Sequence, residues 1–266
     1  MCGIAGIVNF RGKRVEPAEI EHLTDLQAHR GPDGDGHWFN ANRNVALGHR
    51  RLAIIDPGPG GQQPMVSADG RYVITYNGEI YNFLELRREL EAQGHVFRTQ
   101  SDTEVILAAW QTWQQGMLSR FNGMWALAIF DTKTEALFLA RDRFGIKPLL
   151  YAMSPERLVF ASEQRAIVQS GLITASVDIG VARRLLIDAF GIEGSERTLC
   201  NEVSRLQGGH SMWLRDGKLS VRRWWCTLDH LPVLPKTEDE RVAPGGVVPR
   251  SHSSLLVCRH RADHGG

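Results

Sequence analysis

The sequence has few cysteines, no long apolar run and almost no net charge, and each shortage excludes a class of protein. Its 266 residues include four cysteines, which lie far apart and form no C-x-x-C pair, so neither a zinc site nor a disulfide framework is expected. No apolar stretch approaches the roughly 20 residues that span a membrane, and the first ten residues lack the features of a signal peptide. The 31 Lys and Arg residues balance 30 Asp and Glu residues, which favours neither nucleic acid nor an acidic membrane surface as a partner. We expect a cytoplasmic protein.

The rest of the composition is that of an ordinary globular protein, with one exception at the C-terminal end. Hydrophobic residues make up 42% and charged residues 23% of the chain, which is enough to build a substantial core. Residues 226–266 differ, because Gly, Pro and Ser are frequent there and the histidines are scattered without metal-ligand spacing. We expect an irregular or disordered tail over this range.

The first three residues, Met1-Cys2-Gly3, are chemically suggestive. Removal of Met1 would place a thiol and an α-amine on one residue. A free Cys has a pKa of about 8.5, and an α-amine has a pKa of roughly 7.7–8.0, which suits a general base near neutral pH. Cys2 could therefore supply both nucleophile and base. Taken alone, a cysteine at position 2 is more simply explained by chance.

Two polar positions allow both a structural and a functional interpretation. Asn77-Gly78 follows a strand-like segment, and this dipeptide is typical of a tight hairpin turn, which we favour from the dipeptide alone. In the alternative, the Asn77 amide and the Gly78 N–H lie beside a reacting carbonyl. Asp102 follows Ser101 in a capping-box pattern completed by Glu104, so a first-turn acid in a helix explains it. In the alternative, Asp102 holds a substrate ammonium.

The apolar pattern predicts strands and their surroundings. Residues 124–130 are apolar without alternation, which predicts a strand covered on both faces and favours stacked sheets with helices outside. A strand is also predicted over residues 51–55, ended by Asp56-Pro57. The charged stretch 141–148 is predicted to be a solvated or ion-paired connector.

Six short motifs, read in order, resemble the glutaminase domain of class II glutamine amidotransferases, and most closely that of the asparagine synthetases. They are Met1-Cys2-Gly3-Ile4-Ala5-Gly6, His29-Arg30-Gly31-Pro32-Asp33-Gly34, Gly48-His49-Arg50-Arg51-Leu52, Tyr76-Asn77-Gly78-Glu79-Ile80-Tyr81-Asn82, Ser101-Asp102-Thr103-Glu104, and residues 141–148. The resemblance covers residues 2–225, with a core at about 2–165 and a connecting segment to 225. It implies an α+β fold, the N-terminal-nucleophile αββα sandwich with two stacked, largely antiparallel sheets.

The resemblance also implies roles for individual residues. Cys2 would attack the side-chain amide of glutamine and form a glutamyl thioester, with Asn77 and the Gly78 N–H as oxyanion hole. Arg51 would pair with the substrate α-carboxylate, with Arg50 as the nearest alternative. Asp102 and the Gly78-Glu79 segment would receive the α-ammonium. The implied substrate-binding set is Arg51, Leu52, Ile54, Ile55, Asn77, Gly78, Glu79 and Asp102.

One part of the family pattern is missing from the sequence. Asparagine synthetases continue into a domain with a Ser-Gly-Gly-x-Asp-Ser pyrophosphate-binding loop, and no such run occurs here. We therefore expect the ammonia-producing half alone, with no metal or cofactor of its own. ATP and Mg²⁺ are expected only for the absent synthetase domain. A separate synthetase subunit or a second copy of the chain is considered as partner.

Two other functions remain open at this point. One is a non-catalytic module that binds glutamine or a synthetase subunit. The other is an N-terminal-nucleophile hydrolase acting on a different amide, which Arg51 and Asp102 disfavour because they match an amino-acid head group.

Overall fold

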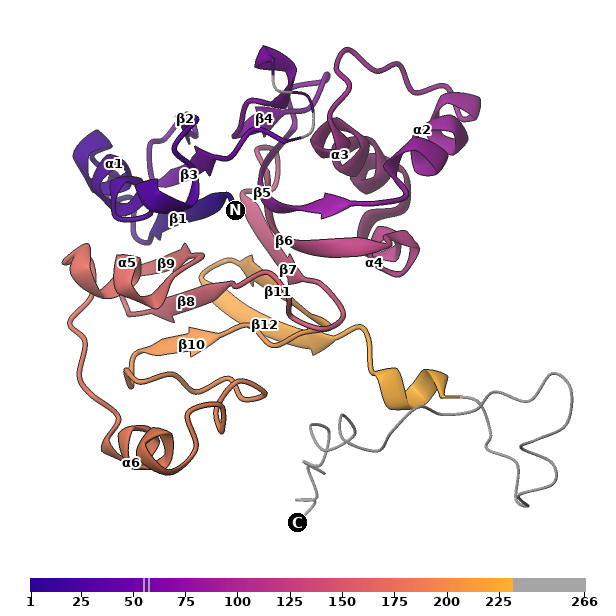
Figure 1. The fold of residues 1–266 in the computed structure, drawn as a ribbon. Helices are drawn as coiled ribbons and strands as arrows, with labels where there is room; N and C mark the ends of the chain where they lie inside the picture. The colour runs from indigo at the N-terminus through magenta and orange to yellow at the C-terminus, as the bar shows by residue number, and fades with distance from the viewer. Residues whose placement is uncertain (55, 57, 232–266) are drawn as a thin grey trace, which may run out of the picture. The chain divides into compact units, whose positions relative to one another are not determined.

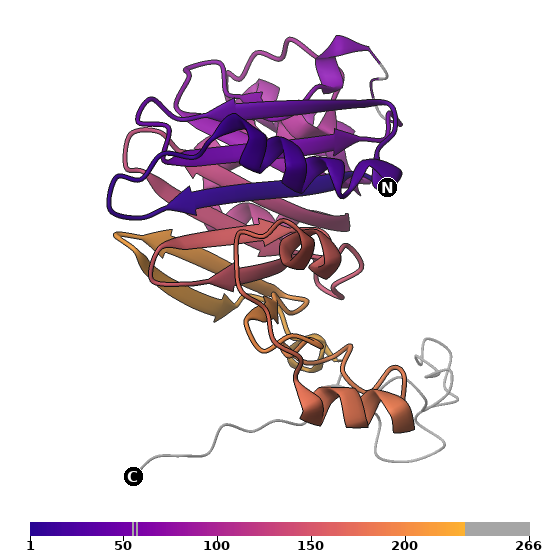
Figure 2. The same ribbon diagram turned by 90° about the vertical axis from the view of Figure 1, so that its left-hand side faces the viewer.

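Two antiparallel six-stranded sheets stack face to face, and helices cover their outer faces (Figures 1 and 2). The structure is a computed structural model that describes residues 1–54, 56 and 58–231. The sheets belong to one unit, Met1–Trp225. Of the second unit, Cys226–Gly266, only residues 226–231 are described, and they include a 3₁₀ turn at Thr227–His230. Most of the predicted tail, residues 232–266, lies outside the described residues.

The first sheet contains the N-terminal strand near its centre. In the order β10-β8-β9-β1-β3-β2, its strands are β10 (Val203–Arg205), β8 (Leu150–Met153), β9 (Arg157–Ala161), β1 (Gly3–Asn9), β3 (Val45–Arg51) and β2 (Gly34–Phe39). Strand β1 pairs with β3 on one side and with β9 on the other. Cys2 is therefore held at the start of an interior strand, at one end of the sandwich (Figure 2).

The second sheet contains the nine-residue strand Tyr72–Ile80, which carries Asn77 and Gly78. In the order β12-β11-β7-β6-β5-β4, its strands are β12 (Lys218–Arg223), β11 (His210–Arg215), β7 (Ala136–Arg141), β6 (Gly123–Asp131), β5 (Tyr72–Ile80) and β4 (Met65–Val66). Strand β4 pairs only with the beginning of β5. The later half of β5 therefore has a strand on one side only, and this open edge becomes important for the site.

The helices form the two outer layers (Figure 1). The first sheet packs against α1 (Pro17–Asp25) and α5 (Gln164–Gln169), and the second sheet lies beside α2 (Phe83–Ala92), α3 (Asp102–Trp113) and α4 (Met117–Arg120). Helix α6 (Ile179–Ile187) lies in the connection between β9 and β10. The buried side chains accordingly fall into three clusters: one between the sheets and one under each helical layer. Helices outside two stacked antiparallel sheets make the four-layer αββα sandwich, so the predicted fold class is confirmed.

Strand β6 shows why the sequence pattern favoured stacked layers. Trp125, Leu127 and Ile129 face the helices of the second sheet, whereas Ala126 and Phe130 face the first sheet. All five side chains are almost completely buried. A strand between two apolar layers needs no polar face, so the prediction of a doubly covered strand is confirmed.

Two local predictions are wrong. Asn77-Gly78 is no hairpin turn, because β5 runs through it and pairs in continuous register with β6 as far as Ile80. A Cβ at position 78 would collide with the backbone at Met124 and Trp125, so this Gly is required for close strand contact. The strand predicted over residues 51–55 is also wrong where the structure describes it, because β3 ends at Arg51 and residues 52–54 are not in a strand, while Ile55 lies outside the described residues.

Among the described residues, no helix combines the length and the apolar character needed to cross a bilayer.

Candidate active site

The Cys2 thiol is tied to the end of β3. The Leu52 N–H donates to Cys2 Sγ at 3.3 Å, and the thiol in turn lies 3.6 Å from the Leu52 carbonyl oxygen. Arg30 Nε donates to the Cys2 carbonyl at 3.0 Å, and the same guanidinium pairs with Glu163 at 3.0 Å. The motif around Arg30 therefore holds the backbone of Cys2.

The electrostatic surroundings of Cys2 act in opposite directions. Burial raises the pKa of its thiol, whereas the Leu52 hydrogen bond and the positive charges of the amino terminus, Lys147 and Arg51 lower that pKa, with the net effect upward. Lys147 is itself 5% exposed. A thiol with a raised pKa is mostly protonated at neutral pH, so its activation requires a base.

The open edge of β5 presents backbone donors at every second residue. The Tyr76 N–H donates to Gln63 Oε1 at 2.6 Å, and the Ile80 N–H donates to Asp102 Oδ2 at 3.1 Å. In an antiparallel strand, alternate residues direct their N–H groups to the same side. The Gly78 N–H therefore points to this edge as well, between two donors that side chains have already engaged.

The neighbouring strand leaves the Gly78 N–H free. Gly78 lies opposite Trp125 of β6, but Trp125 uses its N–H and its carbonyl for Asp142, at 3.1 and 2.8 Å. The Gly78 N–H points away from the β5–β6 ladder, and on its open side no described residue accepts a hydrogen bond from it. The adjacent Asn77 side chain is 1% exposed, and its Nδ2 has no hydrogen-bond partner among the described residues. Two neighbouring N–H groups are thus left without an acceptor.

Contacts between the sheets place these two donors at the Cys2 end of the sandwich. The Thr75 hydroxyl bonds the Gly48 carbonyl at 3.0 Å, and His49 Nε2 bonds the Tyr76 carbonyl at 3.1 Å. Positions 75 and 76 of β5 therefore lie over positions 48 and 49 of β3. Continuing in the same direction, positions 77 and 78 lie over the end of β3, where position 50 pairs with position 3.

A pair of carboxyl groups lies further along β5. Asp102 is 4% exposed, and its Oδ2 accepts hydrogen bonds from Ile80 N–H and from the Tyr76 hydroxyl at 2.9 Å. Burial raises the pKa of Asp102, the two hydrogen bonds lower it, and the negative charge of the nearby Glu79 raises it further. Asp102 is therefore an interior group, although the Ser101 side chain does cap α3 as predicted, by accepting from the Thr103 N–H. Two acidic groups with unfavourable mutual interaction suit a cationic ligand.

The arginines at the end of β3 face different surroundings. Arg51 donates to the Asp56 carbonyl, whereas Arg50 pairs with Asp25 and Asp35, both at 3.6 Å. Arg50 therefore already has acidic partners within the protein. Of the other predicted binding residues, Leu52 is partly buried, the Ile54 side chain is 58% exposed, and Ile55 lies outside the described residues.

The prediction of a solvated or ion-paired connector over residues 141–148 is wrong, because the side chains of Arg141, Asp142 and Lys147 are buried, and Arg141 and Asp142 bond backbone groups. Asp142 is 1% exposed and accepts hydrogen bonds from the N–H groups of Trp125, Phe144, Ile146 and Lys147 at 3.0–3.1 Å. Arg141 satisfies carbonyl groups of the same loop. The loop thereby fixes Trp125 opposite Gly78 and places Lys147 near Cys2.

Replacing Asp142 with alanine should destabilise the protein strongly. Four N–H groups would lose their acceptor, and those of Trp125 and Lys147 are buried. A buried donor left unsatisfied costs roughly 1–3 kcal/mol, so we expect a loss of about 4 kcal/mol in the free energy of unfolding from these two donors and the two partly buried ones together. Urea unfolding followed by circular dichroism measures it. Asp25→Ala is the matched control, because its surface pair with Arg50 should contribute less than about 1 kcal/mol. Equal losses for the two variants would contradict the role given to Asp142.

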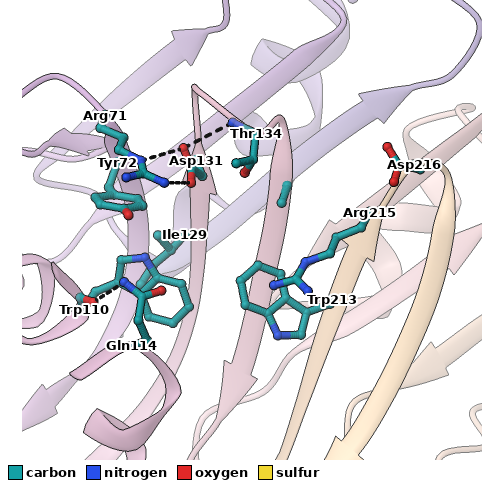
Figure 3. Close-up of a pocket in the computed structure, with 11 residues that line it drawn as sticks. Arg71, Tyr72, Trp110, Gln114, Ile129, Asp131, Thr134, Trp213, Arg215 and Asp216 are labelled. Atoms are coloured by element: carbon teal, nitrogen blue, oxygen red, sulfur yellow. Dashed lines mark hydrogen bonds and ion pairs between the residues drawn. The ribbon is translucent and has the colours of Figure 1, made fainter. Parts of the chain in front are cut away.

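A cavity of about 400 Å³ lies elsewhere on the second sheet (Figure 3). Figure 3 shows Arg71 turned onto Asp131, with contacts of 2.8 and 3.1 Å, and Arg215 lying along the Trp213 indole, 3.7 Å from its centroid. Its lining residue Tyr72 is six residues from Gly78 along β5, which corresponds to about 20 Å. This cavity therefore does not belong to the Cys2 site.

Comparison with known proteins agrees with this geometry. The family described as "Glutamine amidotransferase domain" matches residues 1–225. The chain belongs to this family. The glutamine amidotransferase domain found here is 38% identical over 232 residues to asparagine synthetase (glutamine-hydrolyzing) 3 of Bacillus subtilis, covering 85% of this chain and 36% of that protein. It is 34% identical over 254 residues to a putative asparagine synthetase (glutamine-hydrolyzing) 2 of Methanocaldococcus jannaschii, covering 89% of this chain and 48% of that protein.

The chain thus spans between about a third and a half of the length of these relatives. Among solved structures, glutamine phosphoribosylpyrophosphate amidotransferase of B. subtilis aligns with a TM-score of 0.65 and 21% identity, covering 84% of this chain and 49% of that one. This likeness supports the fold alone. The predicted resemblance to class II glutamine amidotransferases, and to asparagine synthetases in particular, is confirmed.

The amidotransferase domain brings most of the predicted site residues to one end of the sandwich. Cys2, Arg51 and Leu52 meet at the end of β3, and the strand carrying Asn77, Gly78 and Glu79 lies across from them and reaches Asp102. Sequence reasoning missed Gln63, His49 and Lys147. For His49 and Lys147, only their place in two of the six motifs could have indicated them. Gln63 lies in none of these motifs, and neither periodicity nor charge pattern distinguishes it from a structural residue.

Proposed function

We propose that this domain hydrolyses glutamine to glutamate and ammonia through a thioester on Cys2. The two unpaired N–H donors, Asn77 Nδ2 and the Gly78 N–H, are the observation that carries the proposal. Asn77 Nδ2 is buried, and a buried donor without an acceptor carries a free-energy cost in the folded protein. Such a cost is expected where donors await an anion that forms only during a reaction.

The nucleophile requires a free amino terminus. Removal of Met1, which is 55% exposed, would leave Cys2 first, with its amine beside its own thiol. This amine takes the thiol proton, and the sulfur attacks the amide carbon of glutamine. The protonated amine then returns the proton to the leaving nitrogen, so that ammonia departs and a glutamyl thioester remains. Water, deprotonated by the same amine, then attacks the thioester. The C–S bond breaks and releases glutamate, and the amine returns its proton to the Cys2 sulfur.

The oxyanion of each tetrahedral intermediate receives two hydrogen bonds, from Asn77 Nδ2 and from the Gly78 N–H. Both donors are held by the strand, and the Tyr76 and Ile80 N–H groups on either side are engaged by Gln63 and Asp102. Donors that need no reorientation during the reaction stabilise the charge most effectively.

The amino-acid head group of glutamine would lie between the end of β3 and the start of α3. Arg51 offers a planar, two-pronged partner for the α-carboxylate, and the carboxyl groups of Asp102 and Glu79 receive the α-ammonium. Leu52 and Ile54 would contribute the wall along the substrate, whereas Ile55 lies outside the described residues. Because the relatives are glutamine-hydrolysing asparagine synthetases, we propose a synthetase-type domain as acceptor of the ammonia. ATP and Mg²⁺ would serve that acceptor domain, and a non-catalytic role beside a separate synthetase subunit is the alternative.

Ammonia release from a panel of amides tests the proposal. Protein with a verified Cys2 amino terminus is incubated with glutamine, asparagine and a glutamine analogue that lacks the α-amine, and ammonia and glutamate are quantified. We expect equal amounts of glutamate and ammonia from glutamine and little turnover of the other amides. Hydrolysis of all three at similar rates would indicate a different amidase, and glutamine binding without turnover would indicate a regulatory module.

Replacing Arg51 with lysine should weaken substrate binding more than the chemical step. A point charge cannot reproduce two parallel hydrogen bonds, so we expect KM to rise by about tenfold or more and kcat to change by less than about threefold. Arg50→Lys is the matched control, because Arg50 pairs with Asp25 and Asp35. A raised KM in the Arg50 variant, and not in the Arg51 variant, would move the carboxylate site to Arg50.

A further inference from the structure

Two buried hydrogen bonds cross the layer between the sheets. The Thr75 hydroxyl donates to the Gly48 carbonyl at 3.0 Å, and His49 Nε2 lies 3.1 Å from the Tyr76 carbonyl. The layer otherwise consists largely of buried apolar side chains. Burying a polar group in such a place costs free energy unless the group is hydrogen-bonded, and a buried pair that is hydrogen-bonded favours one specific arrangement of the two sheets.

The state of the His49 ring follows from its partner. A carbonyl only accepts hydrogen bonds, so Nε2 carries the proton. His49 is 1% exposed, and burial, together with the charge of Arg51, lowers its pKa to about 4 against the opposing effect of the Tyr76 bond. The ring is therefore neutral near pH 7, and its Nδ1 lone pair is buried without a hydrogen-bond partner among the described residues. A leucine of similar volume would avoid that unpaired atom, so core packing alone does not account for a histidine.

His49 connects the two halves of the proposed site. The Tyr76 carbonyl belongs to the same planar peptide group as the Asn77 nitrogen and Cα, so the hydrogen bond orients the backbone that carries Asn77 and Gly78. His49 itself lies on β3, whose continuation places the Leu52 N–H against Cys2 Sγ.

We propose that His49 is a positioning residue that holds the oxyanion-hole strand β5 at a set distance from the nucleophile Cys2. It touches neither substrate nor reacting atoms and acts through the Tyr76–Asn77 peptide. The consequence for catalysis rests on the proposed function, whereas the effect on β5 does not.

Three substitutions at His49 separate its donor from its volume. His49→Leu removes the donor, and His49→Gln keeps an N–H at the same number of bonds from the backbone. His49→Asn carries the same amide group as the Gln variant, but one bond closer to the backbone. We expect the Leu and Asn variants to lower kcat by roughly 10- to 100-fold with KM within about threefold, because misplacement of about 1 Å is costly to catalysis. The Gln variant should recover most of kcat.

Two further measurements do not depend on glutamine turnover. Hydrogen–deuterium exchange of a peptide spanning residues 74–81 should accelerate in His49→Leu and His49→Asn, but not in His49→Gln, while a peptide spanning residues 136–141 stays unchanged. Alkylation of Cys2 by iodoacetamide needs no oxyanion hole, so its rate should stay within about twofold of the unsubstituted protein. Thr75→Val is the matched control: it removes the neighbouring hydrogen bond between the sheets, and its kcat should stay near that of the unsubstituted protein.

Several results would overturn the proposal. Unchanged exchange over residues 74–81 in His49→Leu would show that the bond does not hold β5. Equal kcat for the Gln and Asn variants, or equal losses in Thr75→Val and His49→Leu, would indicate general core stability. If His49→Leu does not fold, the comparison of the Gln and Asn variants decides. If the unsubstituted protein does not hydrolyse glutamine, the proposed function fails, and the exchange experiment still decides whether His49 positions β5.

Discussion

Cys2→Ala protein should release no measurable glutamate or ammonia from glutamine and should still bind glutamine. The substitution removes the only atom proposed to form a covalent bond with the substrate, while Arg51, Asp102 and the two N–H donors remain in place. We expect kcat to fall by roughly 10⁵-fold or more. Glutamate formation measures turnover, and titration calorimetry measures glutamine binding.

Cys200→Ala is the matched control for this experiment. Cys200 is also a free, partly buried cysteine, but its sulfur accepts a hydrogen bond from Gln164 at the N-terminus of α5. Its replacement should leave glutamine turnover unchanged. Turnover by Cys2→Ala near the rate of the unsubstituted protein would eliminate Cys2 as nucleophile.

Protein that retains residues ahead of Cys2 should lose most of its activity. An amide nitrogen is not basic, so the thiol, whose pKa burial raises, would have no adjacent base. General base catalysis typically contributes 10²- to 10⁴-fold, and we expect kcat to fall by about that factor. Because Met1 is exposed, residues added before it can extend into solvent without disturbing the fold.

A cleavable extension provides the control within one preparation. Intact mass before and after cleavage establishes which residue is first, and glutamine turnover is measured on both samples. Activity should appear only after Cys2 becomes the amino terminus. Full turnover by protein whose mass shows an uncleaved extension would refute the role given to the α-amine.

The layer architecture could be anticipated because it follows from short-range patterns. The apolar run at 124–130 has no polar face, so it specifies burial on both sides regardless of the rest of the chain. The structure confirms this in β6.

The prediction of a hairpin turn at Asn77-Gly78 was wrong because the local turn preference of this dipeptide competed with strand pairing to a distant segment of the chain. Nine consecutive residues of β5 pair with β6, which follows more than 40 residues later. Such long-range pairing outweighs the local turn preference of a dipeptide. The charged loop failed for a similar reason, because the N–H groups that Asp142 satisfies become its neighbours only after folding.

The sequence by itself determined the stacking of layers, the family resemblance and the identity of the groups at the site, since each depends on residue type and order along the chain. Only the tertiary structure decided which of those groups are engaged and which are free. Gln63, Asp102 and Asp142 occupy the hydrogen-bonding groups around Gly78, and His49 joins the strand of Asn77 to the strand beside Cys2. Hydrogen bonds extend over about 3 Å, so their pattern depends on positions that exist only when both sheets have come together.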